Sequence, residues 1–220
     1  MNRRRVLPEH IRREQIVNAA FEVIYQEGLT QTTIAKIAKQ ANLSTGIVSH
    51  YFGDKQGLIF ACMREMLNTL RRKTAQYRCA ADTTPQAQIV AIIDSNFDAT
   101  QITQQAMRLW LEFWSASMHM PELQRMQRIN DQRLYSNLHH HFLQLISKEQ
   151  ASIAARGMAA LIDGLWLRGS LISHHPDAFN TEQARQIAYD YLAMHINLHT
   201  SRLQEEKSES VTHPSIVHSR

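Results

Sequence analysis

The stretch TTIAKIAKQANLSTGIVSHYF, residues 32–52, has the pattern of two short helices joined by a tight turn. Its first half places apolar residues at helical spacing and so predicts one buried stripe, made of Ile34, Ile37, Ala38 and Ala41. Asn42 tolerates the left-handed conformation that a tight turn requires, and the Ser44 hydroxyl can cap the next helix. We therefore expect the second helix to begin at about Thr45.

The second helix of this pair is expected to present small polar residues to solvent. Val48 and Phe52 are four residues apart and can both face inward. The opposite side then carries a surface that can approach base edges in a DNA major groove: Thr45, Gly46, Ser49 and His50. Glycine destabilises a helix interior by roughly 0.5–1 kcal/mol relative to alanine, so Gly46 indicates close approach to a partner. The alternative is an ordinary pair of packed helices, but several local features agree on DNA binding.

The charge of the chain is concentrated where this helix pair lies. Residues 1–80 contain 13 Lys and Arg against 6 Asp and Glu, whereas residues 81–220 contain 11 against 14. A positive N-terminal part suits the neutralisation of DNA phosphates. The chain has 220 residues, 44% of them apolar and 20% charged, which is typical of a globular protein with one or two domains.

Other composition signals exclude several classes of protein. Cys62 and Cys79 are too few for a disulfide framework, so we expect a reducing, cytoplasmic environment. No apolar run approaches the roughly 20 residues of a membrane span. We find no nucleotide-binding glycine loop, no HExxH and no GxSxG, and therefore expect neither an enzyme nor a cofactor. His139, His140 and His141 are adjacent and point apart on a helix, while His195 and His199 lack a third ligand, so no metal site is predicted.

Helical periodicity without strand-like alternation predicts an all-α fold of about nine helices. The first helix is expected at about residues 9–27, ended by Gly28, and the fourth at about residues 55–76. Thr84 and Pro85 form a helix start, and later helices are expected at about residues 102–119, 121–147, 148–170 and 181–202, with Thr181 as the last cap. The predicted domains are residues 1–54 for DNA binding, 55–202 for effector binding and dimerisation, and 203–220 as a disordered tail.

The last two predicted helices carry apolar faces that a homodimer would cover. Those faces consist of Met158, Leu161, Ile162 and Leu165 on one helix, and of Ala184, Ile187, Ala188, Tyr191, Leu192 and Ile196 on the other. A two-fold dimer would place two reading helices on a palindromic DNA operator. Packing of both faces inside one chain is the alternative.

The helix pair resembles the TetR family of transcriptional repressors. The residues that follow the family pattern are Thr33, Ile37, Ala38, Ala41, Ser44, Tyr51, Phe52 and Lys55. The resemblance implies an all-α repressor that binds DNA through Thr33, Ser44, Thr45, Gly46, Ser49, His50, Tyr51 and Lys55. Asn42 stands where the family usually has glycine, and Ser49 stands where many members have a phosphate-binding tyrosine.

Further segments resemble those family members that repress glycine betaine synthesis genes and respond to choline: RREQIVNAA, STGIVSHYFGDKQGL, NFDATQ, LEFWSASMH and ALIDGLWLRGS. A quaternary ammonium ion is recognised by aromatic faces and a nearby carboxylate. The candidate effector residues are Asn96, Asp98, Trp110, Trp114, Tyr135, Asp163 and Trp166. Tryptophans are more often core residues, and a TetR-type regulator of another cationic or hydrophobic compound is the rival hypothesis.

Overall fold

The computed structural model describes residues 8–172 and 180–212. Within these ranges the chain forms nine α-helices and no strand, which confirms the all-α prediction. The helices are α1 (Glu9–Gln31), α2 (Ile34–Gln40), α3 (Thr45–Phe52), α4 (Lys55–Ala80), α5 (Pro85–Asn96), α6 (Gln104–Ser117), α7 (Pro121–Phe142), α8 (Lys148–Ile172) and α9 (Thr181–Thr212). None of the helices in this described part is both long and apolar enough to cross a membrane.

The chain divides into two compact units, and both α4 and α7 pass from one to the other. The first unit consists of Met1–Ala75 and Asp98–Gln132, and the second consists of Gln76–Phe97 and Arg133–Arg220. This division differs from the predicted boundary after residue 54. The first unit joins the N-terminal helices to α6, because α6 packs directly on α1.

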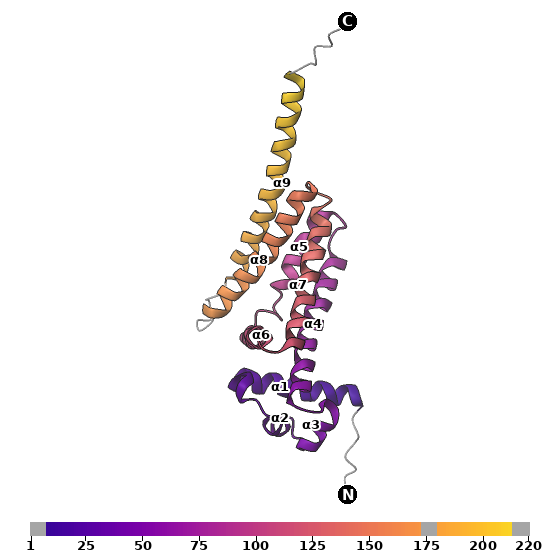
Figure 1. Cartoon of the computed structure of the whole chain (residues 1–220), viewed down its shortest axis with the longest axis vertical. Coiled ribbons are helices and arrows are strands. Elements are labelled where there is room, and N and C mark those ends of the chain that lie inside the picture. The colour runs from indigo at the N-terminus through magenta and orange to yellow at the C-terminus, as the bar shows by residue number, and fades with distance from the viewer. Residues whose placement is uncertain (1–7, 173–179, 213–220) are drawn as a thin grey trace. The chain divides into compact units, whose positions relative to one another are not determined.

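In the first unit, α1 packs against α2 and α2 against α3, as Figure 1 shows. One apolar stripe of α1 is buried, made of Ile16, Ala19, Ala20, Val23 and Ile24. Ile37 of α2, Val48 of α3 and Leu58 of α4 are also buried and complete this small core. The periodicity of the sequence therefore located the inward faces of these helices correctly.

Two residues with positive φ shape the connections in the first unit. Gly28 has φ 80° and interrupts α1 where a C-terminal glycine was predicted, although one more turn follows it as far as Gln31. Asn42 has φ 54° in the turn between α2 and α3, which confirms the left-handed conformation expected for it.

The second unit is held together by a polar link between α5 and α9. Thr84 caps α5 by accepting a hydrogen bond from the Ala87 amide at 3.4 Å, as predicted. The Tyr189 hydroxyl of α9 donates to the Asp94 carboxylate of α5. Arg185, one turn before Tyr189, lies 3.6 Å from the same carboxylate. These bonds fix the N-terminal half of α9 on α5.

Two helix limits differ from those predicted. α7 ends at Phe142 and not near Ser147, because the Ser147 hydroxyl accepts from the Gln150 amide at 3.5 Å and so belongs to the start of α8. At the start of α9 the cap is Asn180, whose side-chain oxygen accepts from the Gln183 amide at 2.9 Å. The prediction that Thr181 caps this helix is therefore wrong.

α9 also continues beyond its predicted end at Arg202, as far as Thr212. The segment LQEEKSES from residue 203 consists mostly of good helix formers and contains neither glycine nor proline, so the helix has no local reason to stop there. The prediction of a disordered tail from residue 203 is wrong up to Thr212. The rest of that predicted tail, residues 213–220, lies outside the described part.

α8 and α9 form an antiparallel pair (Figure 1), and part of the face predicted for a dimer is buried within the chain. Part of the predicted dimer face is already covered inside the protomer: Met158, Ile162, Ala184, Ala188 and Leu192. The exposed apolar residues on these helices are Ile153, Leu167 and Leu171 of α8 and Ile187, Met194 and Leu198 of α9. Periodicity identified apolar stripes but could not tell which stripe meets the neighbouring helix.

Candidate nucleic-acid interface

Side-chain caps begin both α2 and α3. The Thr33 hydroxyl accepts from the Lys36 amide at 3.3 Å and begins α2. The Ser44 hydroxyl accepts from the Ile47 amide at 3.4 Å and begins α3, as predicted. Both side chains satisfy amides that would otherwise lack partners at a helix N-terminus. The caps therefore define where α3 starts and which of its residues face outward.

The outward side of α3 is open to solvent in the structure. Val48 is completely buried beneath the helix. The predicted DNA-contacting residues that are exposed are Thr33, Ser44, Thr45, Gly46, Ser49 and His50. These residues offer hydroxyl groups and an imidazole, which can donate to or accept from base edges and phosphates.

Tyr51 and Lys55, the other two predicted DNA contacts, are half-buried. The Tyr51 ring lies edge-on to the His50 ring, with centroids 5.3 Å apart. The Lys55 ammonium donates to the Thr30 carbonyl at 3.1 Å, at the end of α1. This hydrogen bond holds the charge of Lys55 beside the start of α4, so the ammonium is positioned before any phosphate approaches.

Arg13 of α1 supports the C-terminal end of α3, and the sequence did not indicate this role. Its guanidinium donates to the Tyr51 carbonyl at 2.9 Å and lies 4.6 Å from the centroid of the Phe52 ring. A charged donor on a terminal carbonyl and a cation over an aromatic face both stabilise the helix end. No local pattern reveals this contact, because Arg13 and Tyr51 are 38 residues apart.

Lys36 of α2 pairs with the end of α1. Its ammonium contacts the Glu27 carboxylate and donates to the Gln31 carbonyl at 2.9 Å. Lys39, one turn later on α2, is exposed. Lys36 therefore fastens α2 to the end of α1, although like Lys39 it remains exposed to solvent.

Glycine is present at positions 28 and 46 for different reasons. At Gly28 the backbone has φ 80° and an added Cβ would lie 3.2 Å from Glu112 Oε1, so the fold itself requires glycine. At Gly46 a Cβ would meet only Ser44 Oγ, at an ordinary 3.9 Å, among the residues that the structure describes. The fold does not explain a glycine inside α3, so the close approach of a partner remains its best explanation.

A cavity of about 360 Å³ lies in the first unit where α1, α4 and α6 meet. Its lining residues are Leu29, Thr30, Lys55, Gln56, Ile59, Ala116, His119 and Met120. Beside it, Glu112 of α6 accepts from the Leu29 amide at 3.0 Å. Lys55 and Thr30, which are joined by a hydrogen bond, are part of the cavity wall. The position of Lys55, a predicted DNA contact, therefore depends on how α1, α4 and α6 meet.

Three predicted effector residues belong to the first unit. Asp98 is buried, accepts from the Thr100 amide at 2.9 Å and lies 3.4 Å from the Lys73 ammonium. The buried Trp110 donates its indole N–H to Gln101 at 3.3 Å. Trp114 is half-buried, with its ring 6.3 Å from that of Trp110 and tilted by 46°. Asp98 and Trp110 thus have structural partners, and Trp114 is the more accessible ring.

The other four predicted effector residues belong to the second unit. The Asn96 amide donates to the Ile92 carbonyl at 2.8 Å. The Arg156 guanidinium lies 4.7 Å from the centroid of the Tyr135 ring, so a cation already occupies that aromatic face. Trp166 is buried and Asp163 is exposed on the same helix, α8. The seven predicted effector residues are therefore divided between the two units.

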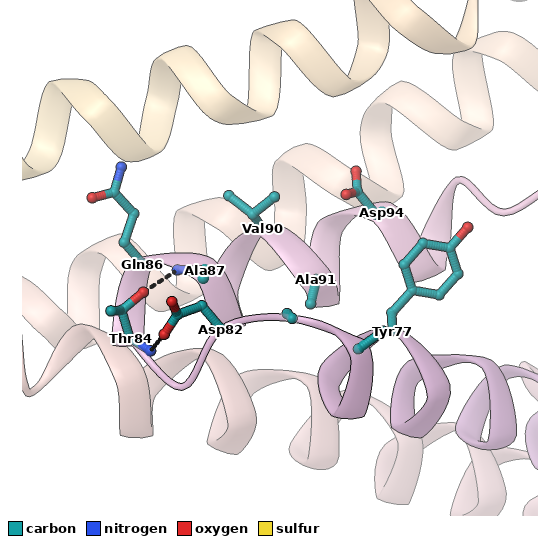
Figure 2. Close-up of a pocket in the computed structure, with 10 residues that line it drawn as sticks. Tyr77, Asp82, Thr84, Gln86, Ala87, Val90, Ala91 and Asp94 are labelled. Atoms are coloured by element: carbon teal, nitrogen blue, oxygen red, sulfur yellow. Dashed lines mark hydrogen bonds between the residues drawn. The ribbon is translucent and has the colours of Figure 1, made fainter.

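A surface groove of about 590 Å³ lies in the second unit between the end of α4 and α5. Figure 2 shows Tyr77 and Asp94 at one end of it and Asp82, Thr84 and Gln86 at the other. The negative charge of Asp94 already has partners in Arg185 and Tyr189. None of the predicted effector residues lines this groove, and it therefore does not correspond to the predicted effector site.

No group of three His, Cys, Asp or Glu side chains suitable for a metal ion occurs among the described residues. His195 packs against Tyr191, with ring centroids 4.6 Å apart, and burial lowers its pKa. This histidine is an element of helix packing in α9.

Comparison with known families agrees with this geometry. Residues 16–62, which contain α2 and α3, match the model of bacterial regulatory proteins of the tetR family. Residues 85–197 match the C-terminal model of BetI-type transcriptional repressors. The chain belongs to the TetR family. As a TetR-family repressor with a BetI-type C-terminal domain, it is a transcription factor and not an enzyme.

Individual TetR-family relatives cover most of the chain. The HTH-type transcriptional regulator BetI of Stenotrophomonas maltophilia is 55% identical over 84% of this chain and 92% of its own length. The regulator of the same name from Ectopseudomonas mendocina is 50% identical over 85% of this chain and 94% of its own. TetR-family regulators bind operator DNA and usually act as dimers, so the surface of α3 is the expected DNA contact.

Solved structures share the fold of this TetR-family chain. A transcriptional regulator from Pseudomonas aeruginosa PAO1 superimposes with a TM-score of 0.72 at 23% identity, covering 89% of this chain and 96% of that one. A regulator from Saccharomonospora viridis, solved in complex with choline, has a TM-score of 0.71 at 17% identity, covering 84% of this chain and 96% of that one. At these identities the likeness concerns the fold alone.

Proposed function

We propose that this protein represses genes for the synthesis of glycine betaine from choline, and that choline modulates its binding to a palindromic operator in the cytoplasm. The observation that carries the proposal is the 55% identity over 84% of the chain to a regulator named BetI. The BetI-type match to residues 85–197 supports it independently of the DNA-binding helices. The choline complex of the Saccharomonospora viridis regulator is consistent with the same effector in a related fold.

The proposed DNA contacts divide into two groups by chemistry. Lys55 and Tyr51, held at the junction of α3 and α4, would bind phosphates and set the position of α3 on the duplex. The exposed residues on α3 would face base edges: Thr45, Gly46, Ser49 and His50. Thr33 and Ser44 lie at helix N-termini, where a hydroxyl and free amides favour a phosphate oxygen.

We propose that two copies pair through the exposed apolar side chains of α8 and α9. Leu171 is 65% exposed, Ile153 53% and Leu198 50%, which is unfavourable for large aliphatic side chains in water. Burying them against a second copy would remove this cost. A two-fold pair would carry two α3 helices and would explain why each protomer needs only one.

We propose that choline binds through aromatic faces and a carboxylate, as other quaternary ammonium ligands do. Trp114 is the predicted ring with the most accessible surface in its unit, and Asp163 is the predicted carboxylate that is exposed. Binding of choline to the conformation with the lower DNA affinity would weaken repression by its differential affinity, usually about 1–3 kcal/mol. Replacement of Trp114 or of Trp166 by alanine should weaken choline binding.

The test is a gel-shift titration of the DNA immediately upstream of the gene for this chain, with and without millimolar choline. We expect a specific complex that choline weakens roughly 5- to 150-fold, and a smaller choline effect in Trp114→Ala or Trp166→Ala. Calorimetry on the same proteins checks that choline binds. A specific complex that ignores choline, together with no heat of binding, would refute choline as the effector and leave a TetR-family repressor of another ligand.

A further inference from the structure

The outward side of α3 carries one large apolar side chain, Ile47, which is not among the predicted DNA contacts. Ile47 is 37% exposed, whereas its neighbour Val48 is completely buried. Successive helical residues are rotated by about 100°. If the direction between Val48 and Phe52 is taken as inward, His50 points outward, and Gly46 and Ile47 lie on either side of it. Ile47 thus lies on the outward half of the helix, about 60° from its centre.

The surroundings of Ile47 are polar and open. Its amide is used by the Ser44 cap, which fixes the first turn of α3 and therefore the direction of the isoleucine side chain. Gly46 next to it leaves space in front of the helix, because a Cβ there would meet only the Ser44 hydroxyl. The outward face thus combines one aliphatic side chain with the side-chain-free backbone of Gly46 and with polar residues. Such a face fits a partner that is mainly polar but offers one apolar group for contact.

The DNA major groove has such a point, because thymine is the only base that presents a methyl group there. A helix that approaches closely at Gly46 would bring the Ile47 side chain to the depth of base edges. Apolar contact with this methyl group distinguishes thymine from the other bases without any hydrogen bond. The chemistry of Ile47 therefore complements the hydroxyl groups and imidazole that surround it.

We propose that Ile47 contacts the 5-methyl group of a thymine in each half of the operator and selects thymine at that position. The proposal rests on the proposed DNA binding by α3. It adds a base-selecting residue that acts by apolar contact. Ile47 is 37% exposed and is not among the buried core residues, so we expect its replacement by alanine to change the reading surface and to preserve the fold.

The experiment replaces single thymines of the operator by deoxyuridine, which removes only the methyl group. The probe is a fluorescein-labelled duplex from the DNA upstream of the gene for this chain, trimmed to the segment that the native protein protects. Binding of native protein, Ile47→Ala and Ile129→Ala is measured to each substituted duplex. Ile129 of α7 is a matched control, because it is an isoleucine with 43% exposure outside the DNA-binding helices.

For the native protein we expect one thymine in each half-site whose replacement lowers affinity about fourfold, and about fifteenfold when both are replaced. Ile47→Ala should bind the unmodified duplex correspondingly more weakly and be indifferent to deoxyuridine at that position, while Ile129→Ala should behave like native protein. The inference would be overturned if Ile47→Ala lost as much affinity as native protein on replacement of that thymine by deoxyuridine. It would also be overturned if no single replacement changed the affinity of native protein. Native protein that binds no upstream DNA would instead refute the proposed function, and this inference with it.

Discussion

The Leu29 amide donates a hydrogen bond of 3.0 Å to the Glu112 carboxylate, which joins the end of α1 to the middle of α6. The bond forms just after Gly28, where the positive φ breaks α1 and leaves an amide without a helical partner. Two further bonds run alongside it, from Gln105 to Glu22 at 3.0 Å and from Tyr25 to Gln104 at 3.5 Å. A helix outside the DNA-binding helices thus positions the end of α1, to which Lys55 is also bound.

Glu112→Ala is expected to lower the free energy of unfolding by about 1–3 kcal/mol, because it leaves the Leu29 amide without its acceptor. Urea unfolding followed by circular dichroism measures the change. Glu14→Ala is the control, since Glu14 is an exposed carboxylate on α1 and its replacement should stay within about 0.5 kcal/mol of native protein. Equal stability of Glu112→Ala and Glu14→Ala would show that the bond contributes nothing to the fold.

Gly46→Ala is expected to change stability and DNA binding in opposite directions. Alanine should stabilise α3 by roughly 0.5–1 kcal/mol, because its Cβ meets no close neighbour and the helix loses the entropic cost of glycine. The same Cβ should obstruct DNA, so operator affinity should fall while the melting temperature rises by about 2 °C. Fluorescence anisotropy and thermal melting on one preparation measure both. Unchanged operator affinity would mean that DNA does not approach at Gly46.

Lys55→Ala is expected to weaken binding to operator and to unrelated DNA alike, because a phosphate contact carries no sequence information. The slope of log affinity against log salt should become shallower by about one for each copy of the chain on the DNA. Lys148→Ala, at an exposed position of α8, is the control and should leave the slope unchanged. A salt slope equal to that of native protein would remove Lys55 from the phosphate contacts.

His141 is expected to make stability depend on pH below neutrality. Its Nε2 lies 3.2 Å from the Arg78 guanidinium, and burial together with the charges of Arg78 and His140 lowers its pKa. As pH falls through the ordinary histidine pKa of about 6.5, the unfolded chain takes up a proton that the folded chain resists, so stability decreases. His141→Gln should flatten this loss between about pH 7 and 5 in urea titrations, whereas His140→Gln, at an exposed position, should retain it. Parallel pH profiles for all three proteins would contradict this account.

The local geometry of the α2–α3 pair could be predicted because its signals are local. The Ser44 cap and the left-handed Asn42 depend on residues within four positions along the chain, and the structure has both. Ile47 was not among the predicted DNA contacts, because an apolar residue in a helix is assigned to the core as long as its exposure is unknown. The effector residues were predicted from composition and resemblance alone. In the structure, Asp98 forms an ion pair with Lys73 and accepts a hydrogen bond from the Thr100 amide.

By itself the sequence determined the helical class, most helix starts and the identity of the reading helix, since 3.6-residue periodicity, caps and breakers act between neighbours in the chain. Only the tertiary structure decided which apolar residues of α8 and α9 are buried within the chain and which stay exposed. It also decided that Arg13 supports α3 and that Glu112 takes the amide after Gly28. Such contacts join residues far apart in sequence, and their energy depends on distance and burial in space, which no local pattern encodes.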